Sequence, residues 1–307
     1  NYHSKGLIIH VDVTSYYPSL MIRYGFLTRN CAYPEKFKDI YDTRVALKKA
    51  GKKKEQAPYK IVLNGTYGIS KDKMSLAYDP RQANNVCVNG QLLLIDLIDK
   101  LEVIQGFELI QSNTDGLIVK IPDTDIAFNQ LDDICFEWEQ RTGMGLGFDY
   151  IDEIWQKDVN NYIFRDVDGK LERKGGYVKE LSDLDNNLPI VNKAIVDFLT
   201  AGIPIETTIN TCNDLKQFQM ICKISSKYKC LIHGDSRLFE RCVRVFASKY
   251  NDGGLYKLHQ NKTKPDKFPS TPVNCFIVND DVNGKSVPAK LDRQFYINMA
   301  KERVQGY

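Results

Sequence analysis

The sequence predicts an α+β protein in which an antiparallel sheet carries inserted helices and a second, mostly helical region follows. Residues 7–13 form a near-continuous apolar run, typical of a strand buried on both faces. Residues 107–111 and 116–121 are two further strand-like runs on either side of a tight turn. Beyond Pro189 the pattern is mostly helical and poor in strands. Helical length and spacing recur in the segments between the strands: 37–50, 57–70, 82–103 and 125–141.

The size and composition are those of an ordinary globular protein. A chain of 307 residues favours about two domains, and the plausible boundary lies near residues 186–189. Hydrophobic residues make up 43% and charged residues 26% of the chain. It contains no signal peptide and no apolar run long enough to cross a bilayer. We therefore expect no membrane partner and a cytoplasmic location, in a host cell if the source is viral.

The cysteines and the charges narrow the class of protein further. The eight cysteines include no Cys-x-x-Cys pair and are too widely spaced for a zinc knuckle, so free thiols in a reducing compartment are expected. Net charge is only +3, but residues 216–267 hold twelve Lys or Arg against four Asp or Glu. Such a block suits a polyanion, because phosphate contacts release counterions. A solvated basic face is the alternative.

A carboxylate stands at the end of the first strand. Asp12 follows the apolar run, and Pro18 is expected to end any regular structure after it. The turn between them offers backbone N–H groups that can face phosphate oxygens. Taken alone, this segment is equally typical of a strand, a turn and a core tyrosine.

The two helices at 37–50 and 57–70 are separated by the short polar connector at residues 51–54, which predicts an antiparallel pair. Lys60, Asn64 and Tyr67 fall at i, i+4 and i+7 and so share one face. A cation, an amide and an aromatic ring on one face fit a nucleoside triphosphate. A frayed helix with a solvated lysine is the alternative.

Two glycines and a second pair of cations support the same ligand. Gly65 and Gly68 each cost roughly 1 kcal/mol relative to Ala in a helix, which makes sense if a flat ligand approaches the backbone. Arg44 and Lys48 form a second cationic i, i+4 pair on the preceding helix. If the helices are antiparallel, both can converge with Lys60 on one triphosphate.

Asp115 lies in the turn between the later strands, within Ser112-Asn113-Thr114-Asp115-Gly116. A hairpin beside the first strand would bring Asp115 and Asp12 into one site. Paired carboxylates repel unless a cation intervenes, which predicts two Mg²⁺ ions, with Mn²⁺ as the alternative. By itself, such a turn is more often structural. A further hairpin is expected around residues 166–169, its second strand ending at residues 175–176.

Taken in their order along the chain, these motifs resemble those of the family B DNA polymerases, particularly the compact bacteriophage and mobile-element forms. Residues 12–19 are similar to the first palm motif of that family, Asp-x-x-Ser-Leu-Tyr-Pro-Ser, with Tyr16 in place of Leu. Residues 60–68 are similar to the fingers motif Lys-x-x-x-Asn-Ser-x-Tyr-Gly, with Gly65 in place of Ser. The match in order continues to Tyr177, and a looser likeness extends through the basic C-terminal part.

Two further segments carry the resemblance. Residues 113–116 are similar to the second palm motif, Asp-Thr-Asp-Ser, although Asn113 replaces its supporting Asp and Gly116 replaces its Ser. The retained Asp115 matches the residue that the family uses as metal ligand. The replacement by Asn113 affects the expected metal preference. Residues 173–177 loosely resemble the Lys-Lys-Arg-Tyr motif, with glycines at two of its cationic positions, which leaves primer grip in doubt.

The resemblance implies a role for each matched residue. Asp12 and Asp115 would be the catalytic metal ligands, with a backbone carbonyl from Val13. Tyr17 would block a ribose 2′-hydroxyl. The residues implied to bind the nucleotide are Ser15, Tyr16, Tyr17, Arg44, Lys48, Lys60, Asn64, Tyr67 and Thr114. Those implied to contact primer or template are Gly68, Asn113, Lys174 and Tyr177.

The same resemblance implies a right-hand architecture. The palm would comprise residues 1–35 and 76–188, the two-helix fingers residues 36–75, and the thumb residues 189–307. The implied function is template-directed DNA polymerase, which adds dNMP to a primer 3′ end by two-metal phosphoryl transfer. Its partners would be primer–template DNA and dNTPs. The alternatives are a catalytically silent, polymerase-derived DNA-binding module and a two-metal nuclease.

The start of the chain carries its own expectation. Asn1 stands where an initiator Met would, and only eleven residues precede Asp12. In the family that the sequence resembles, an exonuclease domain precedes the first palm motif. The resemblance therefore implies that this chain lacks proofreading by itself and is completed by an upstream exonuclease domain or a separate polypeptide. The short interval between Asp12 and Lys60 favours priming from a nucleic-acid 3′ end.

Overall fold

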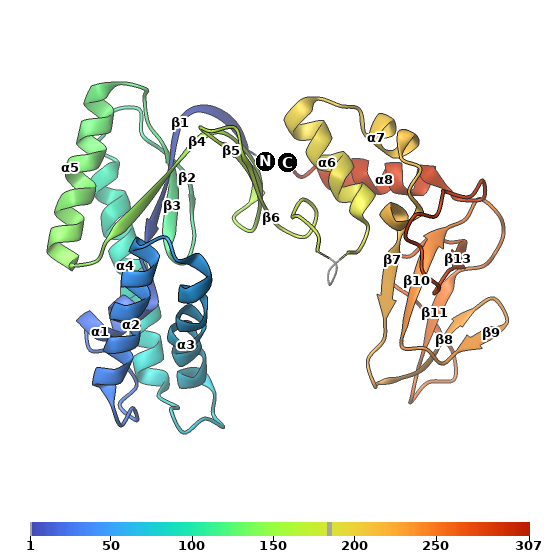
Figure 1. The fold of residues 1–307 in the computed structure, drawn as a ribbon, viewed down its shortest axis with the longest axis horizontal. Coiled ribbons are helices and arrows are strands. Elements are labelled where there is room, and N and C mark those ends of the chain that lie inside the picture. Colours follow the sequence, from blue (N-terminus) through green and yellow to red (C-terminus); the bar gives the residue numbers. More distant parts are fainter. Residues whose placement is uncertain (1, 183–185) are drawn as a thin grey trace. The chain divides into compact units, whose positions relative to one another are not determined.

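A computed structural model describes residues 2–182 and 186–307, so Asn1 and residues 183–185 of the predicted palm lie outside the description. The chain forms two compact units (Figure 1). The N-terminal unit comprises Lys5–Glu153 and Arg165–Lys170. The C-terminal unit comprises Asn1–Ser4, Ile154–Phe164 and Leu171–Tyr307. Each unit has its own hydrophobic core, and each is described by itself.

The N-terminal unit is built on antiparallel strands. Strand β1 (Tyr2–Val13) pairs with β3 (Gly116–Lys120), with Asp12 opposite Gly116. Strand β2 (Glu108–Ser112) pairs with the other edge of β3. These pairings confirm the predicted first strand and the predicted hairpin. The full strand order of this sheet is β2-β3-β1-β4-β5-β6, where β4 spans Leu146–Asp158, β5 Asn161–Asp166 and β6 Leu171–Lys174. Strand β6, most of β5 and the end of β4 belong to the C-terminal unit.

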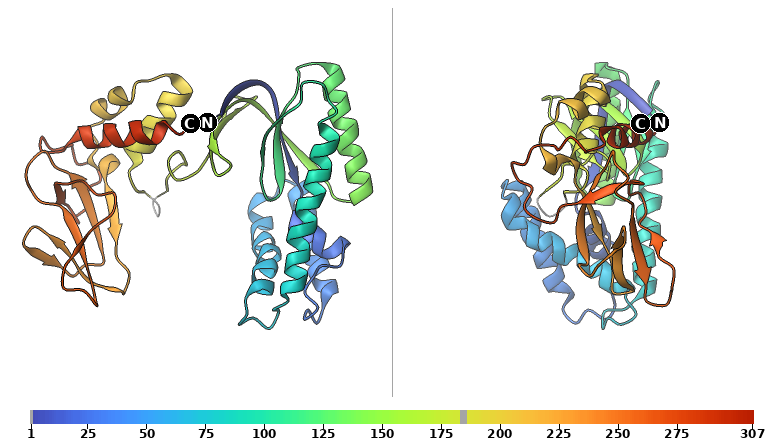
Figure 2. Two further views of the ribbon diagram at one scale, coloured as in Figure 1. Left: turned by 180° about the vertical axis from the view of Figure 1, so that it is seen from behind. Right: turned by 90° about the vertical axis from the view of Figure 1, so that its right-hand side faces the viewer.

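The predicted helices of this unit are confirmed, with ends that shift by a few residues. They are α2 (Pro34–Lys49), α3 (Lys53–Lys71), α4 (Pro80–Leu101) and α5 (Asp125–Thr142). Helices α2 and α3 lie side by side, and α4 and α5 pack against each other beside the sheet (Figures 1 and 2). The buried positions of α4 recur every three or four residues, which gives it one apolar face.

One expectation for this unit was wrong. Pro18 does not end regular structure, because helix α1 (Tyr16–Arg23) begins two residues before it. Proline is tolerated in the first turn of a helix, where its missing N–H has no intrahelical partner anyway. Ser15 caps this helix in the left-handed region, at φ +52°. The turn between β1 and α1 is therefore tight and leads directly into a buried helix.

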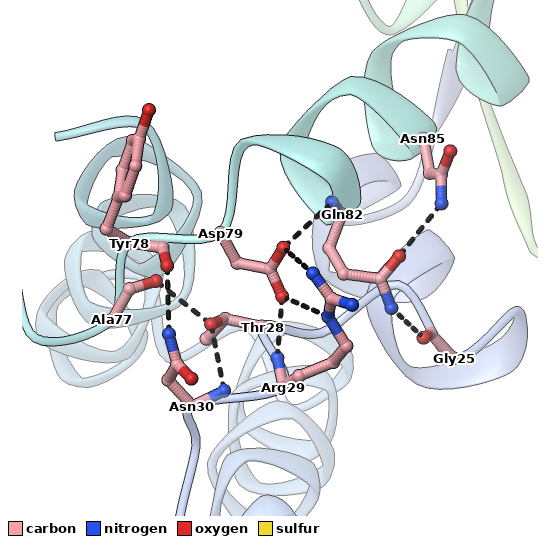
Figure 3. A network of polar contacts seen from close by, with 9 residues as sticks. All are labelled: Gly25, Thr28, Arg29, Asn30, Ala77, Tyr78, Asp79, Gln82 and Asn85. Atoms are coloured by element: carbon pink, nitrogen blue, oxygen red, sulfur yellow. Dashed lines mark hydrogen bonds and ion pairs between the residues drawn. The ribbon is translucent and has the colours of Figure 1, made fainter. Parts of the chain in front are cut away.

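Asp79 ties the start of α4 to the loop after α1 (Figure 3). Its carboxylate accepts hydrogen bonds from Arg29 Nε and Nη2 at 2.8 Å each, from the Arg29 backbone N–H at 3.0 Å and from the Gln82 backbone N–H at 3.4 Å. In the same network the Thr28 hydroxyl donates to the Ala77 carbonyl at 2.9 Å. These bonds cap the helix and fix the loop on it.

The C-terminal unit was predicted to be mostly helical and poor in strands, but the structure contains two sheets there. Three helices, α6 (Pro189–Ala201), α7 (Ile205–Thr211) and α8 (Arg293–Val304), pack together beside the short 3₁₀ turn η1 (Leu215–Phe218). They are accompanied by a three-stranded sheet of order β13-β10-β7 and a four-stranded sheet of order β12-β11-β8-β9. The strands are β7 (Met220–Lys223), β8 (Tyr228–His233), β9 (Ser236–Leu238), β10 (Cys242–Ala247), β11 (Leu255–His259), β12 (Asp266–Lys267) and β13 (Cys275–Ile277).

These strands escaped prediction for a physical reason. Each is short, and the central strand β10 is buried at three consecutive positions, Val245–Ala247, so both of its faces are covered there and the alternation is lost. Pairing between β8 and β11 also shifts register at Leu258/His259. Across residues 2–182 and 186–307, no helix is long and apolar enough to cross a membrane.

Candidate active site

A cavity of about 400 Å³ opens in the N-terminal unit where β1, α1, α2, α3 and the β2–β3 turn meet. The structure brings together there twelve of the residues singled out from the sequence, and one that was not, Gln56. The lining residues are Asp12, Val13, Ser15, Tyr16, Tyr17, Arg44, Lys48, Gln56, Lys60, Asn64, Tyr67, Thr114 and Asp115.

The two carboxylates reach this cavity because β1 and β3 are antiparallel neighbours. The Val13 N–H donates to the Asp115 carbonyl at 2.8 Å, which fixes Asp115 beside the end of β1. Asn113 shapes the turn, since its Oδ1 accepts from the N–H groups of Asp115 and Gly116 at 3.0 Å each. A Cβ at Gly116 would lie 2.5 Å from the Val11 carbonyl oxygen. Glycine is therefore needed at position 116 for the two strands to approach this closely.

The Asp12 carboxylate lies near the end of β1. It is half-buried, and no hydrogen bond or ion pair to its carboxylate occurs within residues 2–182 and 186–307. Burial, and secondly the negative charge of Asp115, raise the pKa of Asp12, while His10 and Lys48 act in the opposite direction. A divalent cation between the carboxylates would relieve both effects.

The donor set fits a hard cation that keeps further oxygen ligands. In the described parts of the chain, no group of three or more His, Cys, Asp or Glu side chains could hold a metal ion alone. The two carboxylates and a carbonyl of β1 would thus need water or phosphate oxygens to complete a shell. Mg²⁺ is commonly bound in this way, through one or two carboxylates plus substrate phosphates.

The cationic wall of the cavity comes from α2 and α3. Arg44 is almost fully buried, with 7% exposure, and its guanidinium donates to Ser15 Oγ and, at 3.1 Å, to Gln56 Oε1. Burial lowers the pKa of Arg44, but an arginine retains its charge. Lys48 and Lys60 are exposed and free to turn toward an anion. Ser15 holds a strained backbone angle at this point, which is common at ligand sites.

The predicted face of α3 does line the cavity. Lys60, Asn64 and Tyr67 all contribute to its wall. A Cβ at Gly65 or Gly68 would meet nothing within 4 Å, so the structure leaves open space beside both glycines. Internal packing therefore does not require glycine at either position, and the space is available to a ligand.

Tyr17 and Tyr67 form another part of the cavity wall. The Tyr17 and Tyr67 rings meet edge to face, with centroids 4.6 Å apart. Burial is the first cause that raises the pKa of each, so both hydroxyls are protonated at neutral pH. Tyr16 plays a different part, because it is 3% exposed and its hydroxyl donates to the Gly90 carbonyl at 2.5 Å. Tyr16 therefore anchors α1 on α4.

Four of the residues singled out from the sequence do not line the cavity. Gly68 is exposed on α3 and Asn113 supports the turn. Lys174 and Tyr177 belong to the C-terminal unit. There the Lys174 ammonium lies 5.6 Å from the Tyr162 ring centroid. Tyr177 lies against Arg303 and Lys157, at 4.4 and 4.9 Å.

Gln56 is the lining residue that sequence reasoning missed. It precedes Lys60 by four residues and therefore shares the helical face of Lys60, Asn64 and Tyr67. Extending that periodicity by one turn would have found it. Together, these groups can hold a multiply charged anion at one end, a divalent cation beside Asp12 and Asp115, and a flat or cyclic group at the tyrosines.

Comparison with known proteins gives a likeness in fold. No protein-family model and no curated protein matches the sequence. Among solved structures, the chain is similar to the family B DNA polymerase from the hyperthermophilic archaeon Pyrobaculum calidifontis, with a TM-score of 0.59 and 14% identity. The match covers 98% of this chain and 44% of that one. The two chains share a mixed fold of helices and antiparallel strands, and this chain spans less than half the length of the other.

Proposed function

We propose that this chain is the catalytic part of a template-directed DNA polymerase. In the reaction, a primer 3′-hydroxyl attacks the α-phosphate of a dNTP, a new phosphodiester bond forms, and pyrophosphate leaves. The observation that carries the proposal is one cavity joining Asp12 and Asp115 to the cations Arg44, Lys48 and Lys60. A carboxylate pair beside a cationic wall suits a metal-bound triphosphate.

In the proposed reaction, the acidic side chains bind the metal and the basic side chains bind the phosphates. Asp12 and Asp115, with the Val13 carbonyl, would hold Mg²⁺ or Mn²⁺, which when bound neutralises charge on the attacking and leaving oxygens. Arg44, kept in place by Ser15 and Gln56, and the exposed Lys48 and Lys60 bind the β- and γ-phosphates. Catalysis of this kind depends on positioning and electrostatics and needs no covalent nucleophile from the protein.

The remaining groups orient the nucleotide. Lys60 and Tyr67 are seven residues apart on α3, which is about 10.5 Å along a helix. A triphosphate bound at Lys60 thus extends its sugar and base toward Tyr67 and Tyr17. Asn64 lies between the two ends, and Thr114 borders the carboxylates.

The finer assignments follow from the same proposal. The palm is proposed as residues 1–35 and 76–188, the fingers as 36–75 and the thumb as 189–307. Lys174 and Tyr177 are proposed to contact the primer, and Gly68 and Asn113 the DNA near the nascent pair. The motif resemblance to bacteriophage and mobile-element forms, an upstream exonuclease and a cytoplasmic location belong to this proposal as well.

The test is single-nucleotide primer extension. A labelled primer annealed to templates that differ in the next base is incubated with the purified chain, Mg²⁺ and one dNTP at a time. The proposal predicts addition of the complementary nucleotide only, abolished by Asp115→Asn and unaffected by Asp133→Asn, an exposed carboxylate on α5. DNA binding without extension would identify a silent binding module, and a shortened primer would identify a nuclease; either result contradicts the proposal.

A further inference from the structure

The thiol of Cys87 lies where three helices meet behind the tyrosine wall. Its Sγ is 2.6 Å from the Tyr67 hydroxyl on α3 and 3.8 Å from the Tyr17 hydroxyl on α1. The Lys71 ammonium is also 3.8 Å from Sγ and lies 4.6 Å from the Tyr67 ring centroid. Cys87 itself is on α4, half-buried, and forms no disulfide. One side chain therefore contacts both tyrosines of the cavity.

The part of α4 that carries this thiol is firmly held against α1. Gly90, about one turn after Cys87, accepts the Tyr16 hydroxyl at 2.5 Å. A Cβ at Gly90 would lie 3.2 Å from Leu20 Cδ1, so the two helices pack closely there. At the start of α4, Asp79 fixes the helix to the loop after α1. The thiol is thus a fixed point against which the two phenol rings rest.

The hydroxyls of Tyr17 and Tyr67 share one contact, the thiol of Cys87. Their rings touch each other edge to face, which restrains their tilt but not their distance from the cavity. Within the described residues both hydroxyls lie within hydrogen-bonding distance of Cys87 Sγ, and the Tyr67 hydroxyl also bonds the Lys71 ammonium, which itself lies 3.8 Å from that thiol. Loss of the thiol would remove the partner that the two hydroxyls share, and would leave the Tyr67 hydroxyl bonded to Lys71, whose side chain is exposed.

We propose that Cys87 is a positioning residue that sets the spacing of Tyr17 and Tyr67, and with it the room left for the sugar of the incoming nucleotide. This inference rests on the proposed polymerase function. Cys87 does not line the cavity and touches no reacting atom, so it acts only through the two tyrosines. Its effect should therefore fall on nucleotide binding and sugar selection rather than on the chemical step.

The experiment compares Cys87→Ala and Cys87→Ser with the wild type. Steady-state extension gives kcat and KM for a dNTP and for the matching ribonucleotide. Loss of a hydrogen-bonding partner predicts that Cys87→Ala raises the KM for dNTP about three- to tenfold, with kcat within about twofold. Discrimination against the ribonucleotide should fall by a similar factor. Cys87→Ser retains a donor and acceptor and should recover most of both properties.

The matched control is Cys31→Ala, which removes another half-buried free thiol from the same unit. It should leave KM and sugar discrimination unchanged. The inference is overturned if Cys87→Ala behaves as wild type, if Cys87→Ser is as impaired as Cys87→Ala, or if Cys31→Ala shows the same shift. An inactive wild type would instead refute the proposed function, so the two failures are distinguishable.

A chemical arm covers the case in which Cys87→Ala does not fold. In protein carrying Cys31→Ala and Cys242→Ala, the Cys87 thiolate attacks methyl methanethiosulfonate, forms a methyl disulfide and releases methanesulfinate. Mass spectrometry identifies the modified residue. The added group should raise the KM for dNTP, and reduction with dithiothreitol should restore it. Complete labelling of Cys87 with unchanged KM and discrimination would overturn the inference.

Discussion

Two carboxylates of the N-terminal unit, Asp79 and Asp12, show opposite electrostatics. Asp79 is 2% exposed and accepts four hydrogen bonds, three of them from Arg29, which lowers the pKa of Asp79. Asp12 has no such partner among the described residues, and burial together with Asp115 raises the pKa of Asp12. The internal partners of Asp79 leave it little to offer a ligand, whereas Asp12 is the carboxylate for which we propose a cation from outside the chain.

Under the proposed function, the difference separates a carboxylate that stabilises the fold, Asp79, from one that acts in the reaction, Asp12. A half-buried charge without a partner costs free energy in the free protein. Such a cost is typical of sites where binding repays it. Substituting the two carboxylates should accordingly damage different properties: activity for Asp12, stability for Asp79.

The largest expected effect is on activity. Asp12→Asn and Asp115→Asn should each reduce the rate of single-nucleotide extension by at least about 10³-fold, because each removes a charged ligand from the proposed metal site. Thermal unfolding should be unchanged or shifted upward, since the substitution removes carboxylate repulsion. A variant that retains activity, or that loses it only by unfolding, would contradict the assignment of Asp12 and Asp115 to activity and not to stability.

The next effect concerns the cationic wall that faces Asp12. Lys60→Ala should raise the KM for dNTP by about 10- to 100-fold, the range expected for a lost charge-assisted hydrogen bond. Lys54→Ala, which removes an exposed lysine from the first turns of the same helix, is the control and should leave KM unchanged. Equal effects of the two substitutions would show that α3 contributes only general positive charge.

A smaller effect is expected on stability at Asp79. Asp79→Ala removes the helix cap and the partner of Arg29, and should lower the free energy of unfolding by about 2 kcal/mol. The Arg29 side chain is 61% exposed, so solvent screening limits what its ion pair with Asp79 adds to stability. Urea denaturation measures the change. Extension at a temperature where the variant is folded should stay within about twofold of wild type, and a larger loss would place Asp79 in the catalytic machinery.

The smallest effect is a pH dependence of that same stability. The pKa of Asp79 is lowered by folding, so its contribution is fully present above the unfolded pKa of about 3.9 and is lost as pH falls through the folded value. The difference in unfolding free energy between wild type and Asp79→Asn should therefore be constant from pH 5 to 7 and shrink below about pH 4. A constant difference down to pH 3 would contradict the assigned ion pair.

Much of the site was predictable because it depends on periodicity and strand pairing. The face of Lys60, Asn64 and Tyr67 follows from helical spacing, and the approach of Asp115 to Asp12 follows from an antiparallel hairpin beside β1. The contacts of Cys87 with Tyr17 and Tyr67 could not be found in this way, because they arise from the packing of three helices that are distant in sequence.

The secondary structure was likewise predictable only where it depends on local sequence periodicity. Long elements such as α4 carry enough turns for their period to emerge, and they were predicted within a few residues. The strands β7–β13 are two to six residues long, and pairing with neighbours rather than local pattern determines them. Helix α1 was missed because Pro18 ends the strand pattern and yet fits the first turn of a helix.

The most direct test of the central claim is anomalous diffraction from crystals of the chain with primer–template DNA, a non-hydrolysable dNTP and Mn²⁺. The account predicts two Mn²⁺ peaks roughly 3.5–4 Å apart, coordinated by Asp12 and Asp115, and none at Asp79. A bound nucleotide with no peak at Asp12 and Asp115, or a peak at Asp79, would contradict it.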